Sequence, residues 1–84
     1  MYEVRLSRRA NSYYQRADRN TARRLDQCFE ALRERPLESS NVAPIRGRSD
    51  TYRYRIRGLR VIFAVNQRDQ IVTVTAIGPR GDVY

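Results

Sequence analysis

The chain has 84 residues, which allows one domain with a modest hydrophobic core. Its formal net charge is +8, and all 17 basic residues are arginine, because the sequence contains neither lysine nor histidine. The absence of histidine excludes an imidazole acid–base pair, and no spacing of carboxylates or cysteine resembles a metal site. Codon preference in a genome rich in G and C would explain the missing lysine. It would not explain why residues 42–84 hold eight arginines and three acids, a balance that indicates a polyanionic partner, with nucleic acid first.

The sequence also bears on the compartment in which the protein works. The longest apolar run, residues 61–65, is far too short to span a membrane, and the N-terminal residues do not resemble a signal peptide. The single cysteine, Cys28, cannot form an internal disulfide, which agrees with a reducing compartment. We therefore expect a cytoplasmic protein that has no membrane partner.

The first half of the chain is predicted to form one strand and two helices. Residues 2–6 alternate apolar and charged side chains, as a half-buried strand does. Ser7 can cap a first helix, whose apolar stripe contains Ala10, Tyr13, Tyr14 and Ala17. Asn20 can cap a second helix, which Pro36 ends. The buried face of the second helix would contain Ala22, Leu25, Cys28, Phe29 and Leu32. Cys28 is therefore interpreted as a core residue and not as a nucleophile.

The second half is predicted to form a loop and three strands. Residues 37–50 are rich in turn formers and are interpreted as the loop. Strands are expected at residues 51–57, 59–65 and 71–77, and Gly78 and Pro79 end the last one. The order of elements is then β-α-α-β-β-β, which is an α+β fold. We expect a single domain over residues 1–84, in which a helical hairpin packs on one face of a four-stranded, mainly antiparallel sheet.

The alternation within the strands predicts which side chains meet the helices. In residues 51–57 the tyrosines and Ile56 would point toward the helices, and the arginines would point away: Arg53, Arg55 and Arg57. In residues 59–65, Arg60 would share the open face with them. A positive sheet face of this kind would bind a phosphate backbone with a strongly salt-dependent affinity. The tyrosines other than the last one are interpreted as core residues rather than as stacking platforms: Tyr2, Tyr13, Tyr14, Tyr52 and Tyr54.

A face of arginines suits one reaction that needs no metal ion and no cofactor. In RNA the 2′-OH can attack the adjacent phosphate, so an enzyme does not have to supply a nucleophile. Arginines that converge on this phosphate would align the attack and neutralise its charge, and each such contact can contribute roughly 3–4 kcal/mol. A tyrosine could stack on a base or help to activate the 2′-OH. The alternative stays open that a basic face of this kind binds RNA without cutting it.

The segment "IRGRSDTYRYRIRGLRVIFAV" and the ending "AIGPRGDVY", together with the order of elements, resemble the RelE branch of the RelE/ParE toxin superfamily. Its members are toxins of bacterial and archaeal type II toxin–antitoxin systems. The resemblance covers nearly the whole chain and implies a RelE-like fold. It also implies an mRNA interferase, a ribosome-dependent endoribonuclease that cuts mRNA in the A site by 2′-OH attack without a metal ion. Such cleavage inhibits translation and arrests growth.

The resemblance implies a catalytic set of five residues. The basic pair of the second predicted strand falls on Arg53 and Arg55, the arginine of the third falls on Arg60, and the C-terminal motif supplies Arg80 and Tyr84. The best-known member often has lysine in the basic pair, whereas an arginine cannot act as a base. Arg53 and Arg55 are therefore expected to align the substrate and stabilise charge, while Arg60 binds the scissile phosphate. Arg80 would assist the leaving oxygen, and Tyr84 would orient or activate the 2′-OH.

The resemblance also implies partners. Besides mRNA on the ribosome and the surrounding ribosomal RNA, we expect a cognate antitoxin that wraps the toxin and covers its active site. An acidic, partly disordered antitoxin would complement the charge of the toxin, and the toxin alone is expected to be monomeric. Arg46 and Arg48, in the loop before residue 51, and Arg57 are interpreted as RNA-binding residues outside the catalytic set.

A second function belongs to another class. ParE-like toxins share the fold but inhibit DNA gyrase by binding protein, without RNA chemistry. They generally lack the combined basic and tyrosine set, so the joint presence of Arg60, Arg80 and Tyr84 favours the nuclease. Binding of RNA without cleavage is the third alternative.

Overall fold

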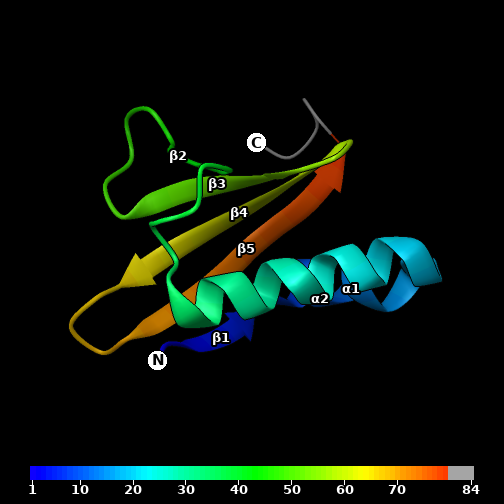
Figure 1. Ribbon diagram of the computed structural model, residues 1–84, viewed down its shortest axis with the longest axis horizontal. Helices are drawn as coiled ribbons and strands as arrows, with labels where there is room; N and C mark the ends of the chain where they lie inside the picture. Colours follow the sequence, from blue (N-terminus) through cyan, green and yellow to red (C-terminus); the bar gives the residue numbers. More distant parts are fainter. Residues whose placement is uncertain (80–84) are drawn as a thin grey trace.

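The computed structural model describes residues 1–79, which form a helical hairpin and a five-stranded sheet (Figure 1). The hairpin consists of α1 (Arg8–Arg16) and α2 (Arg19–Glu34). The strands follow in chain order: β1 (Glu3–Leu6), β2 (Val42–Pro44), β3 (Thr51–Ile56), β4 (Leu59–Asn66) and β5 (Ile71–Pro79). No helix within residues 1–79 is both long and apolar enough to cross a membrane.

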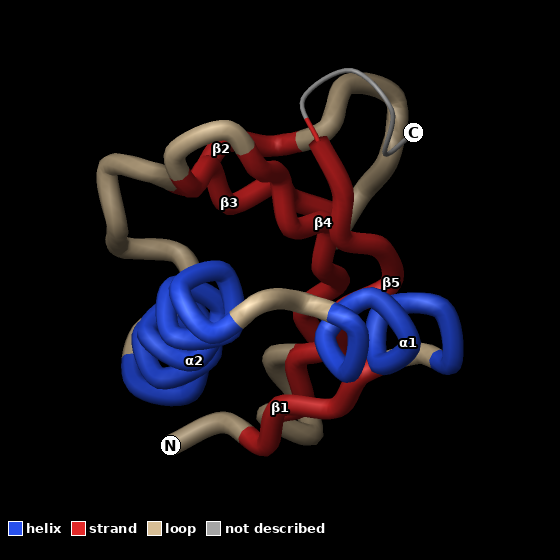
Figure 2. The backbone as a smooth tube through the Cα atoms, turned by 90° about the vertical axis from the view of Figure 1, so that its right-hand side faces the viewer, coloured by secondary structure: helices blue, strands red, loops and turns tan. Residues whose placement is uncertain are grey.

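The strands lie in the spatial order β1-β5-β4-β3-β2. Strand β1 runs parallel to β5, whereas the other three pairs of neighbours are antiparallel. Seen from the end of the hairpin, both helices lie below β2, β3 and β4 (Figure 2). The predicted fold class, a helical hairpin packed on a mainly antiparallel sheet, is therefore confirmed, although the sheet has one strand more than expected.

The additional strand, β2, lies inside the segment that the sequence predicts to be a loop. It pairs with β3, with Val42 opposite Tyr54 and Pro44 opposite Tyr52. Three residues are too few to show an alternating pattern, and proline, which ends β2 at Pro44, is uncommon in strands. Proline is tolerated here because β2 is the edge strand of the sheet. Pairing with β3, and not the local sequence, therefore makes this segment a strand.

The helix ends agree with the sequence at α1 and differ at α2. Ser7 caps α1 as expected, because its side-chain oxygen accepts a hydrogen bond from the Ala10 amide. The cap of α2 is Asp18 rather than Asn20, since Asp18 Oδ1 accepts a 2.7 Å hydrogen bond from the Thr21 amide. Aspartate and asparagine cap helices about equally well, so the local sequence does not distinguish two candidates two residues apart.

Strand β5 continues two residues beyond its predicted end. Gly78, which the sequence suggests as a turn residue, lies within the strand opposite Arg60, and Pro79 lies opposite Leu59. The extension occurs because β4 offers paired positions as far as Leu59. Pro79 can occupy the final position of a strand.

The hydrophobic core fills the space between the hairpin and the sheet. Each helix contributes fully buried side chains, and so do the two long central strands; the members are Ala10, Leu25, Cys28, Leu32, Val61, Phe63, Val65, Val72, Val74 and Ile77. Burying one large aliphatic or aromatic side chain typically contributes about 1.5–3 kcal/mol. The five tyrosines expected to be core residues are partly buried and pack against this cluster, which confirms that interpretation.

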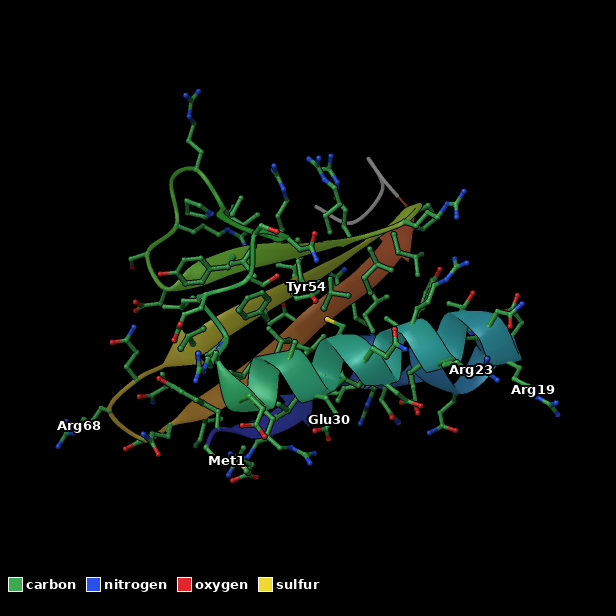
Figure 3. All side chains as sticks on the ribbon, viewed as in Figure 1. Met1, Arg19, Arg23, Glu30, Tyr54 and Arg68 are labelled. Carbon is green, nitrogen blue, oxygen red and sulfur yellow. The ribbon has the colours of Figure 1, made fainter. Side chains whose placement is uncertain are left out.

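The two faces of the sheet are those that the alternation predicts. The side chains of Tyr52, Tyr54 and Ile56 pack against the core, and Figure 3 shows Tyr54 between the sheet and α2. Ile62 lies on the opposite face in a small second cluster with Ala76, against which Ile45 packs. The sheet therefore has a covered face toward the helices and an open face on its other side.

Candidate functional site

Three arginines gather on the open face where β3 and β4 approach their shared turn. Arg53 and Arg55 come from β3, and Arg60 comes from β4; we call this group the arginine face. The strand register places Arg55 directly opposite Arg60, and Arg53 opposite Ile62. Side chains directly opposite one another on antiparallel strands have Cβ atoms roughly 4.5–5.5 Å apart. The register thus brings Arg55 beside Arg60, whose positions are five residues apart in the chain.

Electrostatics of this arrangement favour a bound anion. Like charges directly opposite on neighbouring strands destabilise a sheet. Within residues 1–79 the ion pairs join other residues, such as Arg5 with Glu3 at 2.7 Å, and none involves Arg53, Arg55 or Arg57. Arg55 and Arg57 are exposed, and Arg53 is half-buried. A phosphate group placed here would relieve the repulsion and bind to guanidinium groups suited to bidentate recognition.

A hollow of about 330 Å³ opens at the β3–β4 turn beside the arginine face. Arg55, Arg57 and Arg60 all contribute to its wall, which also contains Asn41, Ile56, Gly58 and Leu59. Gly58 has a φ of 74°, a left-handed conformation that glycine adopts without strain and that allows the tight turn. Arg57 thereby lies next to the arginine face, although it belongs to the turn and not to β3.

A neighbouring hollow of about 270 Å³ adds a residue that sequence reasoning missed. It shares Asn41, Arg55 and Arg57 with the first hollow and extends to Arg24 of α2. Arg24 comes from an amphipathic helix whose charges alternate, so nothing in the local pattern distinguishes it from a solvated surface residue. Asn41 is held in place because its carbonyl oxygen accepts a 3.0 Å hydrogen bond from the Arg55 amide. Only the packing of α2 against β3 brings these residues together.

Two of the expected RNA-binding residues lie at the other end of β3. Arg46 and Arg48 are exposed in the connection between β2 and β3, on either side of Gly47, whose φ is 81°. This connection meets the start of β3, where the Ile45 amide donates to the Thr51 carbonyl. Arg55 lies four positions after Thr51 along the strand, a span of roughly 13 Å. The loop arginines are therefore separate from the hollows at the β3–β4 turn.

The remaining members of the expected catalytic set, Arg80 and Tyr84, lie outside the described residues. Among residues 1–79, no group of three or more carboxylate and thiol side chains is arranged to hold a metal ion. Burial raises the pKa of the Cys28 thiol to about 12, which keeps it protonated near neutral pH and unsuited to nucleophilic attack. Within the described residues, charge stabilisation by arginine is the chemistry that this face can supply.

Comparisons with known proteins identify the family of the chain. A family model described as the ParE toxin of type II toxin–antitoxin system, parDE, matches residues 4–84. The chain belongs to this toxin family. The protein is thus a toxin of a type II toxin–antitoxin system, and the predicted membership of the RelE/ParE superfamily is confirmed. No curated protein matches the chain.

Solved toxin structures share the fold over nearly the whole chain. A chain of the archaeal RelE–RelB complex from Pyrococcus horikoshii is 26% identical, with a TM-score of 0.84 over 96% of this chain and 97% of that one. The isolated E. coli RelE toxin is 22% identical, with a TM-score of 0.82 over 94% and 84% of the two chains. The complex RelBE2 from Mycobacterium tuberculosis provides a match at 22% identity, with a TM-score of 0.76 over 94% and 98%.

Proposed function

We propose that this toxin is a ribosome-dependent endoribonuclease that cuts mRNA in the A site. One observation supports the proposal above the others: Arg55 lies directly opposite Arg60 on an open sheet face, with Arg53 on the same face. A fold does not need such a pair, because like charges in this position oppose folding. Binding of a polyanion, in contrast, does require positive side chains gathered in this way. The substrate class also implies a cytoplasmic site of action, since translated mRNA is cytoplasmic in bacteria and archaea.

The reaction that fits these residues is transesterification within the RNA itself. The 2′-oxygen forms a bond to the adjacent phosphorus as the bond from phosphorus to the 5′-oxygen breaks. The products are a 2′,3′-cyclic phosphate and a 5′-hydroxyl, and the proton of the 2′-OH is balanced by the proton gained by the leaving oxygen. Negative charge accumulates on the phosphoryl oxygens in the transition state. Preorganised cations aimed at these oxygens are therefore the main catalytic requirement.

Each residue of the proposed set has a role that its chemistry permits. Arg60 binds the scissile phosphate, while Arg53 and Arg55 align the strand and stabilise the developing charge. Arg80 assists the departing 5′-oxygen through its field and hydrogen bonds, because an arginine does not readily release a proton. Tyr84 orients or activates the 2′-OH. Arg46, Arg48 and Arg57 contribute general affinity for the phosphate backbone.

The direct test is primer extension on mRNA taken from a translation reaction. The wild-type protein should introduce breaks within codons at the A site, and Arg60→Ala or Arg80→Ala should abolish both the breaks and growth arrest in folded protein. Arg68→Ala is the matched control, because Arg68 is exposed in the turn between β4 and β5, at the opposite end of β4 from Arg60 (Figure 3). Full toxicity of both active-site variants would contradict the assignment, and RNA binding without breaks would favour a non-catalytic domain.

Inhibition of DNA gyrase is the second candidate, and the ParE family model that matches residues 4–84 favours it. In that case the arginine face would bind an acidic protein surface, and no RNA would be cut. The same translation reaction separates the candidates when it is run beside a supercoiling assay. Intact mRNA together with stalled gyrase would establish the second candidate.

A cognate antitoxin is the proposed protein partner. RelE of E. coli has been solved in complex with its antitoxin RelB, and the related P. horikoshii and M. tuberculosis structures are also toxin–antitoxin complexes. The net charge of +8 favours an acidic antitoxin with a segment that covers the arginine face. Co-expression with the product of the adjacent gene should restore growth and co-purify the two proteins. Loss of protection at unchanged expression of both proteins would contradict this pairing.

A further inference from the structure

Strand β5 contains one residue more than its partner β4 at the centre of the sheet. Ile62 lies opposite Ala76, but the next residue, Phe63, lies opposite Val74. Thr75 therefore has no partner on β4 and forms a β-bulge. Bulges of this kind occur frequently next to active sites, where they redirect side chains.

The bulge reverses the faces to which the end of β5 points. Val74 belongs to the core beneath the helices, whereas Ala76 lies with Ile62 on the open face, and Ile77 returns to the core. In a regular strand, residues two apart share a face, so Val74 and Ala76 would both point toward the helices. The extra residue therefore reverses the face of the sheet to which each later residue of β5 points.

This reversal of faces decides which residue of β5 lies beside Arg60. In the structure Arg60 pairs with Gly78, which has no side chain. If Thr75 instead paired with Ile62 in a regular ladder, the register that starts with Phe63 opposite Val74 would place Ile77 opposite Arg60. The branched isoleucine side chain would then occupy the arginine face, and Gly78 would leave a gap in the core. The bulge thus leaves the position opposite Arg60 without a bulky side chain that would block a phosphate.

Side chains from the start of α1 hold the bulge in place. The Thr75 carbonyl oxygen accepts hydrogen bonds from Ser7 Oγ at 2.9 Å and from Arg9 Nε at 3.1 Å. Thr75 Oγ1 in turn donates to the Ile62 carbonyl at 3.3 Å. The Ser7 hydroxyl also accepts from the Ala10 amide at 3.2 Å, so a single group caps α1 and anchors the bulge. These bonds replace the strand-to-strand pairing that Thr75 lacks.

We infer that Ser7, Arg9 and Thr75 are positioning residues for the arginine face. They fix the bulge that pairs Arg60 with Gly78 and keeps bulky side chains away from the phosphate site. The consequence for catalysis rests on the proposed nuclease function, whereas the consequence for strand register does not. The two can therefore be tested separately.

The test is a double variant, Ser7→Ala with Thr75→Val, compared with Asp18→Ala. The double variant keeps a good strand former at position 75 and removes two of the three bonds that hold the bulge. Asp18→Ala removes the same kind of helix cap from α2, which has no link to the bulge. Deletion of Thr75 is the second variant, because it removes the extra residue itself and leaves a regular ladder in which Gly78 still lies opposite Arg60. Urea unfolding establishes the folded fraction of each protein before any other measurement.

Two readouts decide the outcome. Backbone contacts between Arg60 and Gly78, measured by NMR, should weaken in the double variant and give way to contacts between Arg60 and Ile77, whereas the deletion should keep the Arg60–Gly78 contacts. Cleavage of mRNA on the ribosome should fall on the order of a hundredfold in the folded double variant, as expected when a catalytic group is displaced by about 1 Å. Asp18→Ala should keep both the Arg60–Gly78 contacts and wild-type cleavage.

Unchanged Arg60–Gly78 contacts in the double variant would overturn the inference, and so would wild-type cleavage after those contacts are lost. If the wild-type protein itself leaves mRNA intact, the proposed nuclease function fails. The NMR comparison of the same proteins would still decide whether Ser7 and Thr75 hold the bulge.

Discussion

Replacing Arg55 by glutamine should make the folded toxin more stable and less active. Arg55 is exposed at the end of β3 and lies directly opposite Arg60. Glutamine keeps a polar side chain on the strand but removes the charge. A gain in stability that accompanies a loss of activity is expected where a protein maintains a repulsive arrangement for the sake of function.

The register sets the size of both effects. Like charges directly opposite on antiparallel strands cost roughly 0.2–1 kcal/mol. Two unit charges about 7 Å apart in a water-like dielectric repel each other by a similar amount, about 0.6 kcal/mol. For a domain of this size, a gain of about 0.5 kcal/mol raises the melting temperature by roughly 2–4 °C. Loss of one group that stabilises the transition state should lower the cleavage rate by about 10²–10³-fold.

The assay combines thermal unfolding at several salt concentrations with single-turnover cleavage of mRNA on the ribosome. The stability gain should shrink as salt rises, because the screening length falls from about 10 Å at 0.1 M to about 3 Å at 1 M. Arg68→Gln is the control, since it makes the same change of charge in an exposed turn. It should leave the melting temperature and the cleavage rate close to those of the wild type.

The reasoning would be refuted by an Arg55→Gln protein that melts at a lower temperature and cuts mRNA as fast as the wild type. That result would mean that the Arg55–Arg60 pair supports the fold and has no part in the chemistry. A gain in stability that does not depend on salt would also reject repulsion as its cause.

The remaining predictions concern the folded state. The hydrogen bond from the Tyr14 hydroxyl to Asp26 raises the pKa of Tyr14, so its stabilising effect is complete below the ordinary tyrosine pKa of about 10 and is lost as pH rises through the raised value. Urea unfolding at alkaline pH should show this loss in the wild type and not in Tyr14→Phe. Because burial raises the pKa of Cys28 to about 12 from an ordinary 9.0, its thiolate fraction at neutral pH falls by about a thousandfold. Iodoacetamide should therefore label Cys28 only after unfolding, and rapid labelling of the native protein would contradict its burial. Leu25→Ala should destabilise the protein by about 2–5 kcal/mol in urea unfolding because Leu25 is fully buried, whereas the exposed Arg23→Ala should change stability by less than about 0.5 kcal/mol.

The sequence alone was sufficient wherever a single segment carried the signal. Alternation along residues 51–57 predicted that Tyr54 faces the helices and that the arginines occupy the other side. The structure agrees within β3, whereas Arg57 belongs to the turn after it. Ser7 was identifiable as the cap of α1 from its position before the first apolar stripe. These features depend on side-chain periodicity and on groups within one helical turn, which the order of residues specifies directly.

Tertiary structure alone decided the pairing between segments. The short strand β2 exists because β3 offers it an edge, and Arg24 reaches the hollow at Arg55 because α2 packs beside β3. The bulge is the clearest case. Val72, Val74 and Ala76 alternate without a break, so the sequence indicates one face for all three, yet Ala76 points to the opposite face. Hydrogen bonds to Thr75 from residues more than sixty positions earlier impose that reversal, and no local pattern contains information about a partner so distant in the chain.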